Sequence, residues 1–262
     1  MEVDNPVTKN KNIEPSTQQP KKFRKFSAKE FRTLLQGDQK LIAIQGFLQQ
    51  IRENTSQDCA LEYLQKNGTI HELLQSMEQD STLPPVLVFE VVNELLLKII
   101  SSKLNCRDAA YESCRYLLNT FITAVNKMLG LTSSNKERIV ILKLLTTMVT
   151  FSSSLSKDIL LHVNFNLTNL ELLTKNTLEN KTVRKHFVFF LTTMLIDIEY
   201  STLALLLDKK GMLTSIIPGL QYDEVDTVCF ILTTMRNYIL ENQFVSKTVK
   251  MKTFNTIVVK IL

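Results

Sequence analysis

The sequence contains no tryptophan and has only 6 glycines and 6 prolines in 262 residues. This scarcity of helix-breaking residues, together with long runs of Leu, Ile, Val, Lys and Glu, favours a chain that is almost entirely helical. No segment alternates apolar and polar residues over the length that a half-buried strand needs. The composition therefore argues against a fold built on a β-sheet.

Residues that carry chemistry are also scarce. Cysteines stand at Cys59, Cys106, Cys114 and Cys229, and histidines at His71, His162 and His186. The cysteines form no C-x-x-C pair, so we expect free, buried thiols, and no histidine has a second metal ligand four residues after it. Glycine-rich phosphate loops and nucleophile motifs are absent. The sequence predicts no catalytic residue, no metal site, no cofactor and no small-molecule substrate.

The charge and hydropathy of the sequence limit the classes of partner that we expect. The apolar runs fall short of the ~20 residues that cross a bilayer, so we expect no membrane partner. The net charge of +5, from 31 basic and 26 acidic residues, permits contact with nucleic acid without requiring it. Basic residues are sprinkled through the second half, and if helices stack they could form a stripe that follows a phosphate backbone; ordinary solvated lysines are the alternative.

Residues 1–26 are rich in Asn, Lys, Gln, Thr and Pro, and we expect a disordered basic tail. The tail ends in a basic cluster, which is a candidate import signal or RNA contact. Its charged members are Lys21, Lys22, Arg24 and Lys25. The alternative is a solvated tail that has no partner.

The phrase Leu-Thr-Thr-Met occurs three times, at 145–148, 191–194 and 232–235, with spacings of 46 and 41 residues between the leucines. Each copy is also apolar at four residues and one residue before its leucine. Offsets of −4, −1, 0 and +3 share one face of an α-helix, so each copy predicts an amphipathic helix. We interpret the threonines as packing residues whose hydroxyls bond to the preceding turn, and each Met as core. A helix that recurs every ~40–47 residues is typical of armadillo and HEAT units.

Other signals place the helix boundaries. Ser27 with Glu30, and Ser134 with Glu137, form capping-box pairs, and Pro85 suits a first helical turn. A second repeated pattern, in which a helix end is followed by Lys-x-Gly and paired aliphatic residues, occurs at 61–74 and 207–217. We therefore predict an all-α protein, an armadillo/HEAT-like α-solenoid over 27–262. Because the last helix ends without a polar cap, we expect this region to be a fragment of a longer solenoid.

Several segments resemble the N-terminal region of the nucleolar pre-ribosomal-associated protein family, and the resemblance covers about residues 27–262. They are 31–35, 85–100, 142–150, 158–166, 183–190, 209–219 and 242–253, with 88–97 and 147–150 the most telling. The resemblance implies a long nucleolar α-solenoid that joins early precursors of the large ribosomal subunit. It implies that ribosomal RNA folds and matures there with small nucleolar RNAs and a helicase partner. It implies no catalytic residue.

These observations give three hypotheses. The first is a non-enzymatic scaffold in the nucleus and nucleolus that binds pre-ribosomal proteins, pre-rRNA and small nucleolar RNA. The second is a generic armadillo-type adaptor that binds an extended peptide in a groove lined with Asn and aromatic residues. The third is an enzyme, which would need a pocket that gathers histidine and carboxylates from distant repeats.

Overall fold

The computed structural model describes residues 25–53, 59–65, 70–101, 110–112, 115, 118, 122, 134–161, 180–196, 220, 223–243 and 245–261. Over these residues every regular element is a helix, so the predicted all-α class is confirmed. The elements are α1 (Ala28–Gln36), α2 (Lys40–Glu53), α3 (Cys59–Gln65), α4 (Ile70–Gln79), α5 (Pro85–Ser101), α8 (Asn135–Phe151), α9 (Ser153–Leu161), α11 (Lys181–Thr193), α14 (Val225–Met235), a π-helical turn η2 (Arg236–Leu240) and α15 (Lys247–Ile261).

Side-chain caps fix where several helices begin. The Ser27 backbone N–H donates to Glu30 Oε2 at 3.0 Å, and the Glu30 N–H donates back to Ser27 Oγ at 3.3 Å. Ser134 and Glu137 make the same reciprocal pair before α8, at 2.6 and 3.3 Å. Both predicted capping boxes are thus confirmed. The Glu137 carboxylate accepts hydrogen bonds from the backbone and the side chain of Ser134, which lowers its pKa.

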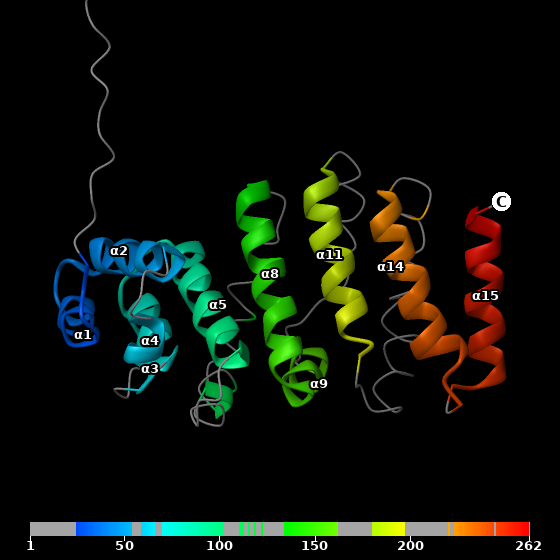
Figure 1. Ribbon diagram of the computed structural model, residues 1–262, viewed down its shortest axis with the longest axis horizontal. Helices are drawn as coiled ribbons and strands as arrows, with labels where there is room; N and C mark the ends of the chain where they lie inside the picture. The colour runs from blue at the N-terminus through cyan, green and yellow to red at the C-terminus, as the bar shows by residue number, and fades with distance from the viewer. Residues whose placement is uncertain are drawn as a thin grey trace, which may run out of the picture.

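Helices α5, α8, α11 and α14 stand side by side in one row and run in the same direction, as the colour gradient of Figure 1 shows. Each of them contacts the next one along the row, and η2 contacts α15 at the far end. The contact of α11 with α8 is much more extensive than its contact with α14. The three Leu-Thr-Thr-Met helices are therefore neighbours.

The predicted apolar face is buried in the first two copies. In α8 and α11 all four positions of the stripe are in the core: Ile141, Leu144, Leu145 and Met148, then Phe187, Phe190, Leu191 and Met194. In α14 only Ile231 and Met235 are buried, whereas Val228 and Leu232 lie at the edge of the core. The sequence thus identifies the correct face, and the third copy is buried less deeply than the first two.

The paired threonines mostly bond to their own helix, as predicted. Thr146 Oγ1 donates to the carbonyl of Leu142, and Thr234 Oγ1 donates to that of Phe230, both at 2.8 Å. Thr192 and Thr193 also donate one turn back, at 2.8 and 2.7 Å. Thr147 departs from this pattern, because its hydroxyl leaves α8 and reaches α5.

Helices α1 to α4 form a cluster at the start of the row, where α2, α3 and α4 contact α5 (Figure 1). Phe31 of α1 stacks on Phe47 of α2 with ring centroids 4.0 Å apart, and Tyr63 of α3 packs edge-on against both rings at 5.4 Å. Phe26 joins this end of the molecule: its N–H donates to Gln50 Oε1 at 2.8 Å, and its ring lies over Gly46, where a Cβ atom would meet it at 2.5 Å. The chain just after the basic cluster is thus attached to α2.

One expectation about side-chain burial is wrong. Cys229 was expected to be buried, but it is an exposed free thiol on α14. Cys106, Cys114, His162, the stretch 207–217 and the Lys-x-Gly part of 61–74 lie outside the described residues.

Within the described residues, none of the helices combines the length and the apolar character that crossing a bilayer requires.

Candidate functional site

The predicted basic cluster falls almost wholly outside the described residues. This applies to Lys21, Lys22 and Arg24, while Lys25 is the first described residue and is exposed. The structure therefore adds only one fact about the cluster: the adjoining Phe26 is held against α2.

The predicted basic stripe is partly tested by the structure. Lys181, Lys185 and Lys247 are exposed, whereas Lys175, Lys209 and Lys210 lie outside the described residues. Arg184 is not available to a phosphate, because its side chain is 3% exposed and is paired with Asp223, which is 5% exposed. Its Nε donates to Asp223 Oδ1 at 2.9 Å and its Nη2 donates to Oδ2 at 3.2 Å. This buried pair joins α11 to the chain just before α14.

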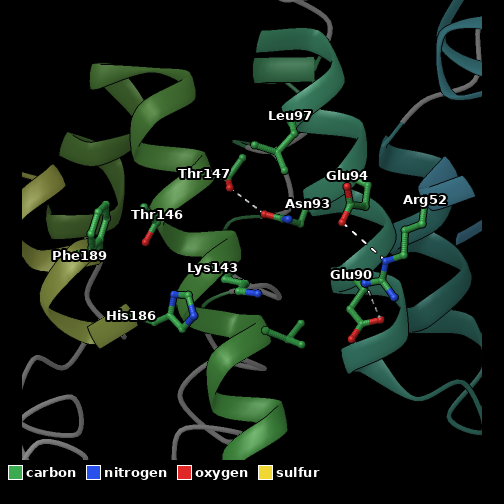
Figure 2. A pocket seen from close by; sticks show the side chains of 11 residues that line it. Arg52, Glu90, Asn93, Glu94, Leu97, Lys143, Thr146, Thr147, His186 and Phe189 are labelled. Atoms are coloured by element: carbon green, nitrogen blue, oxygen red, sulfur yellow. Dashed lines mark hydrogen bonds and ion pairs between the residues drawn. The ribbon is translucent and has the colours of Figure 1, made fainter. Parts of the chain in front are cut away.

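A groove of about 380 Å³ crosses the row from the end of α2 to α11 (Figure 2). Its polar and charged lining residues are Arg52, Glu90, Asn93, Glu94, Lys143, Thr146, Thr147 and His186, and its apolar ones are Leu97, Val140 and Phe189. The α8 and α11 residues follow the repeat, since Val140 and His186 stand five residues before their leucines, and Lys143 and Phe189 stand two before. The face beside the buried stripe therefore lines the groove in successive layers.

Carboxylates gather at the α5 end of the groove. Arg52 Nη2 donates to Glu90 Oε2 at 3.2 Å, and Arg52 Nε lies 3.8 Å from Glu94 Oε1. Figure 2 shows the single guanidinium between the two side chains. Two carboxylates face one arginine, so this end carries a net negative charge.

Asn93 stands between the two ends of the groove. Thr147 Oγ1 donates to its Oδ1 at 2.7 Å, which ties α8 to α5 and fixes the orientation of the amide (Figure 2). The other half of the amide, Nδ2, carries two N–H donors. Among the described residues these donors have no hydrogen-bond partner.

The α8–α11 end carries the opposite charge. Lys143 of α8 is exposed, and it lines the groove together with His186 of α11 (Figure 2). Burial of the imidazole lowers the pKa of His186, and the positive charges of Lys143 and Lys185 lower it further. His186 is therefore neutral at pH 7, and the positive charge at this end belongs to lysine.

An aromatic pair forms the far wall. Phe189 of α11 and Phe230 of α14 stand at the same offset from their leucines, and their rings stack with centroids 4.4 Å apart and an interplanar angle of 3°. Phe189 is 39% exposed, so the outer face of this stack reaches the groove. An exposed aromatic face in a concave site is suited to an apolar or planar group.

This arrangement favours binding over reaction chemistry. Although the groove holds a histidine and two carboxylates, Arg52 holds the carboxylates and Lys143 is the charged neighbour of the imidazole. No described carboxylate accepts a hydrogen bond from His186, so the imidazole lacks the orienting group of a general base. The described residues include no group of three side chains placed to hold a metal ion.

Comparison with known proteins identifies the family of the chain. A family model named Npa1 and described as "Ribosome 60S biogenesis N-terminal" matches residues 67–262, which is well over half of the chain. The chain belongs to the Npa1 family. The resemblance stated from the sequence is thereby confirmed for residues 67–262, and the description of the family names biogenesis of the 60S ribosomal subunit.

A curated relative agrees with this assignment to the Npa1 family. Human nucleolar pre-ribosomal-associated protein 1 is 26% identical over 172 residues, which cover 64% of this chain and 8% of the human protein. This chain thus spans a small part of the length of that relative. No solved structure matches the chain.

Proposed function

We propose that this chain is a non-enzymatic scaffold in nucleolar assembly and rRNA maturation of the large ribosomal subunit, where it binds pre-ribosomal proteins and RNA. Membership of the Npa1 family is the observation that carries the proposal. The name of the human relative, which describes a nucleolar and pre-ribosomal-associated protein, supports a place in the nucleus and nucleolus.

The architecture that we propose for this role is an armadillo/HEAT-like α-solenoid. It is supported by the row of helices in which each contacts its neighbours, and by corresponding residues at matched offsets in successive layers. Helices that stack in one dimension bury one face and leave another exposed along the whole row. Such a surface contacts several partners at once and needs no reactive centre.

Residues 1–26 are proposed as a basic tail ahead of the helical region 27–262. In this proposal Lys21, Lys22, Arg24 and Lys25 form an import signal or an RNA contact, supported by their clustering. Neutralising all four in a fluorescently tagged chain separates the two roles. Loss of nuclear signal indicates import, and normal import with weaker RNA crosslinking indicates the RNA contact.

Ultraviolet crosslinking in cells tests the scaffold function. We expect the protein that contains this chain to enrich precursors of the large-subunit rRNA and small nucleolar RNAs over background. Recovery of no such RNA, together with absence from pre-60S particles on sucrose gradients, would count decisively against the proposal.

A generic armadillo-type adaptor is the second candidate, because the groove does contain an asparagine with two free donors and an exposed phenylalanine. It predicts a location outside the nucleolus, whereas the scaffold predicts nucleolar signal. Imaging of the tagged chain distinguishes the two.

A further inference from the structure

The groove across α5, α8 and α11 has no occupant within the described chain, and its two ends carry opposite charge. The α5 end has Glu90 and Glu94 against Arg52, and the α8–α11 end has Lys143 beside a neutral His186. A ligand that complements this groove needs a positive group at the α5 end and a negative one at Lys143 on α8, the next helix of the row.

The middle of the groove is suited to a polypeptide backbone. Asn93 is held in one orientation by Thr147, so its two N–H donors are set in place before any ligand arrives. A side-chain amide with free donors in a concave site binds the carbonyl groups of an extended chain, because such carbonyls recur along every peptide. Preorganisation of this kind also lowers the entropic cost of binding.

The aromatic wall adds a place for an apolar side chain. Phe189 is supported from behind by Phe230, so its exposed face is rigid. Packed helices lie about 8–10 Å apart and an extended strand rises ~3.3 Å per residue. An extended segment of about six residues therefore reaches from the carboxylates on α5 to Phe189.

We propose that this groove binds an extended segment of a partner protein, with a basic side chain at Glu90 and Glu94, its backbone on Asn93, and an acidic side chain followed by an aromatic or aliphatic one at Lys143 and Phe189. The inference rests on the proposed scaffold function for the source of the segment, an assembly partner, and on the groove for its chemistry. RNA fits less well, because two carboxylates repel a phosphate backbone at one end of the groove.

Fluorescence anisotropy with labelled synthetic peptides of about nine residues tests the charge pattern. The matched peptide carries Lys near one end and adjacent Glu and Phe near the other, and it is made in both chain directions. In the swapped peptide Lys and Glu exchange places. We expect one direction of the matched peptide to bind at least about tenfold more tightly than the swapped one.

Variants locate the binding. Lys143→Glu leaves both ends of the groove negative, so it should remove most of the preference for the matched peptide, and Phe189→Ala should weaken both peptides by about tenfold. The controls are Lys247→Glu and Phe254→Ala on α15, which change an exposed lysine and a phenylalanine that is 53% exposed, away from the groove. These should bind like wild type, and circular dichroism checks that each variant is folded.

Several results would overturn the proposal. These are equal binding of matched and swapped peptides, no binding of either, or equal losses in the α15 controls. Tighter binding of an oligouridine of about ten nucleotides, lost in Lys143→Glu, would assign the groove to RNA. A dimer seen by sedimentation that Phe189→Ala dissociates would assign it to a second copy.

Failure of the groove and failure of the scaffold function are distinguishable. If the chain crosslinks to pre-rRNA in cells but discriminates no peptide, the groove assignment is wrong and the scaffold stands. If the peptides bind as expected but no ribosomal precursor is recovered, the peptide site stands and the scaffold function is wrong.

Discussion

The same four-residue phrase is used differently in two parts of the row. In α8 and α11 the whole stripe is buried, and these two helices share an extensive interface. In α14 the leucine of the phrase is only half-buried, and the contact with α11 is smaller. The contact between α11 and α14 is instead reinforced by the buried Arg184–Asp223 pair and the Phe189–Phe230 stack. A repeat in sequence therefore specifies a face, while the neighbours decide whether apolar area or a few specific contacts hold it.

The largest expected effect is at the α11–α14 joint. Arg184→Ala leaves the Asp223 carboxylate buried without its partner, and we expect the free energy of unfolding to fall by about 3–5 kcal/mol. Urea unfolding measures it. The matched control is Arg52→Ala, which removes an exposed arginine from its carboxylates and should cost at most about 1 kcal/mol. Similar losses for the two variants would show that burial of the pair is unimportant.

The leucines of the phrase give the next comparison. Leu191→Ala opens a cavity in the α8–α11 core and should cost about 2–5 kcal/mol. Leu232→Ala, at the equivalent place in α14, should cost clearly less because its side chain is already half-exposed. Denaturant titration of both variants checks the order. An equal cost would mean that the two copies of the phrase are packed alike.

A smaller difference in stability is expected between substitutions of Thr147 and Thr193. Thr147→Val leaves Asn93 Oδ1 without its donor from α8, and we expect a loss of about 1–2 kcal/mol. Thr193→Val removes only a bond to its own helix from a half-exposed site, so its effect should stay within about 0.5 kcal/mol. Thermal unfolding compares the two. A larger loss for Thr193→Val would contradict the assignment of the cross-helix bond to Thr147.

The smallest effect is a pH dependence in the groove. The pKa of His186 is below its ordinary value of 6.5 in the folded chain, because of burial and of Lys143 and Lys185. Below about pH 6.5 the unfolded chain takes up this proton first, so the free energy of unfolding decreases as the pH falls and stops changing below the folded pKa. Above pH 6.5 the group contributes nothing.

NMR titration of the His186 ring checks the direction. Lys143→Gln should move its pKa back toward 6.5, and His186→Gln should remove this part of the pH dependence from urea unfolding. A pKa that stays unchanged in Lys143→Gln would show that the lysine does not face the ring.

Much of the fold follows from local sequence. The capping boxes at Ser27 and Ser134 and the start of α5 at Pro85 are found as predicted, because each depends on residues within one helical turn. The apolar stripe also follows, since helical periodicity alone determines which side chains share a face. These signals do not depend on which helix packs against the apolar face.

The sequence did not predict which residues line the groove, and the reason is physical. Its walls come from three helices, and periodicity says which face is polar but not which face of another helix lies across from it. Asn180, which caps α11 by accepting from the Val183 N–H at 3.1 Å, was also missed, since it lacks the Glu of a capping box. One signal for the buried pair was available: Arg138 and Arg184 stand at the same offset in successive copies, and both are buried. A charged residue that recurs at one place in a repeat indicates a partner.

The third copy of the Leu-Thr-Thr-Met phrase has Val225 seven residues before its leucine, where the first two copies have arginine. The side chain of Val225 is 76% exposed. The Arg184–Asp223 pair therefore joins α11 to the chain before α14, and α14 has no arginine at the equivalent place. Asp223 stands two residues before α14, so the pair holds the start of that helix against α11, together with the Phe189–Phe230 stack. A small rotation at this joint would produce a larger displacement at the far ends of α14 and α15. Arg184 is thus one of the few contacts on which the rigidity of this part of the row depends.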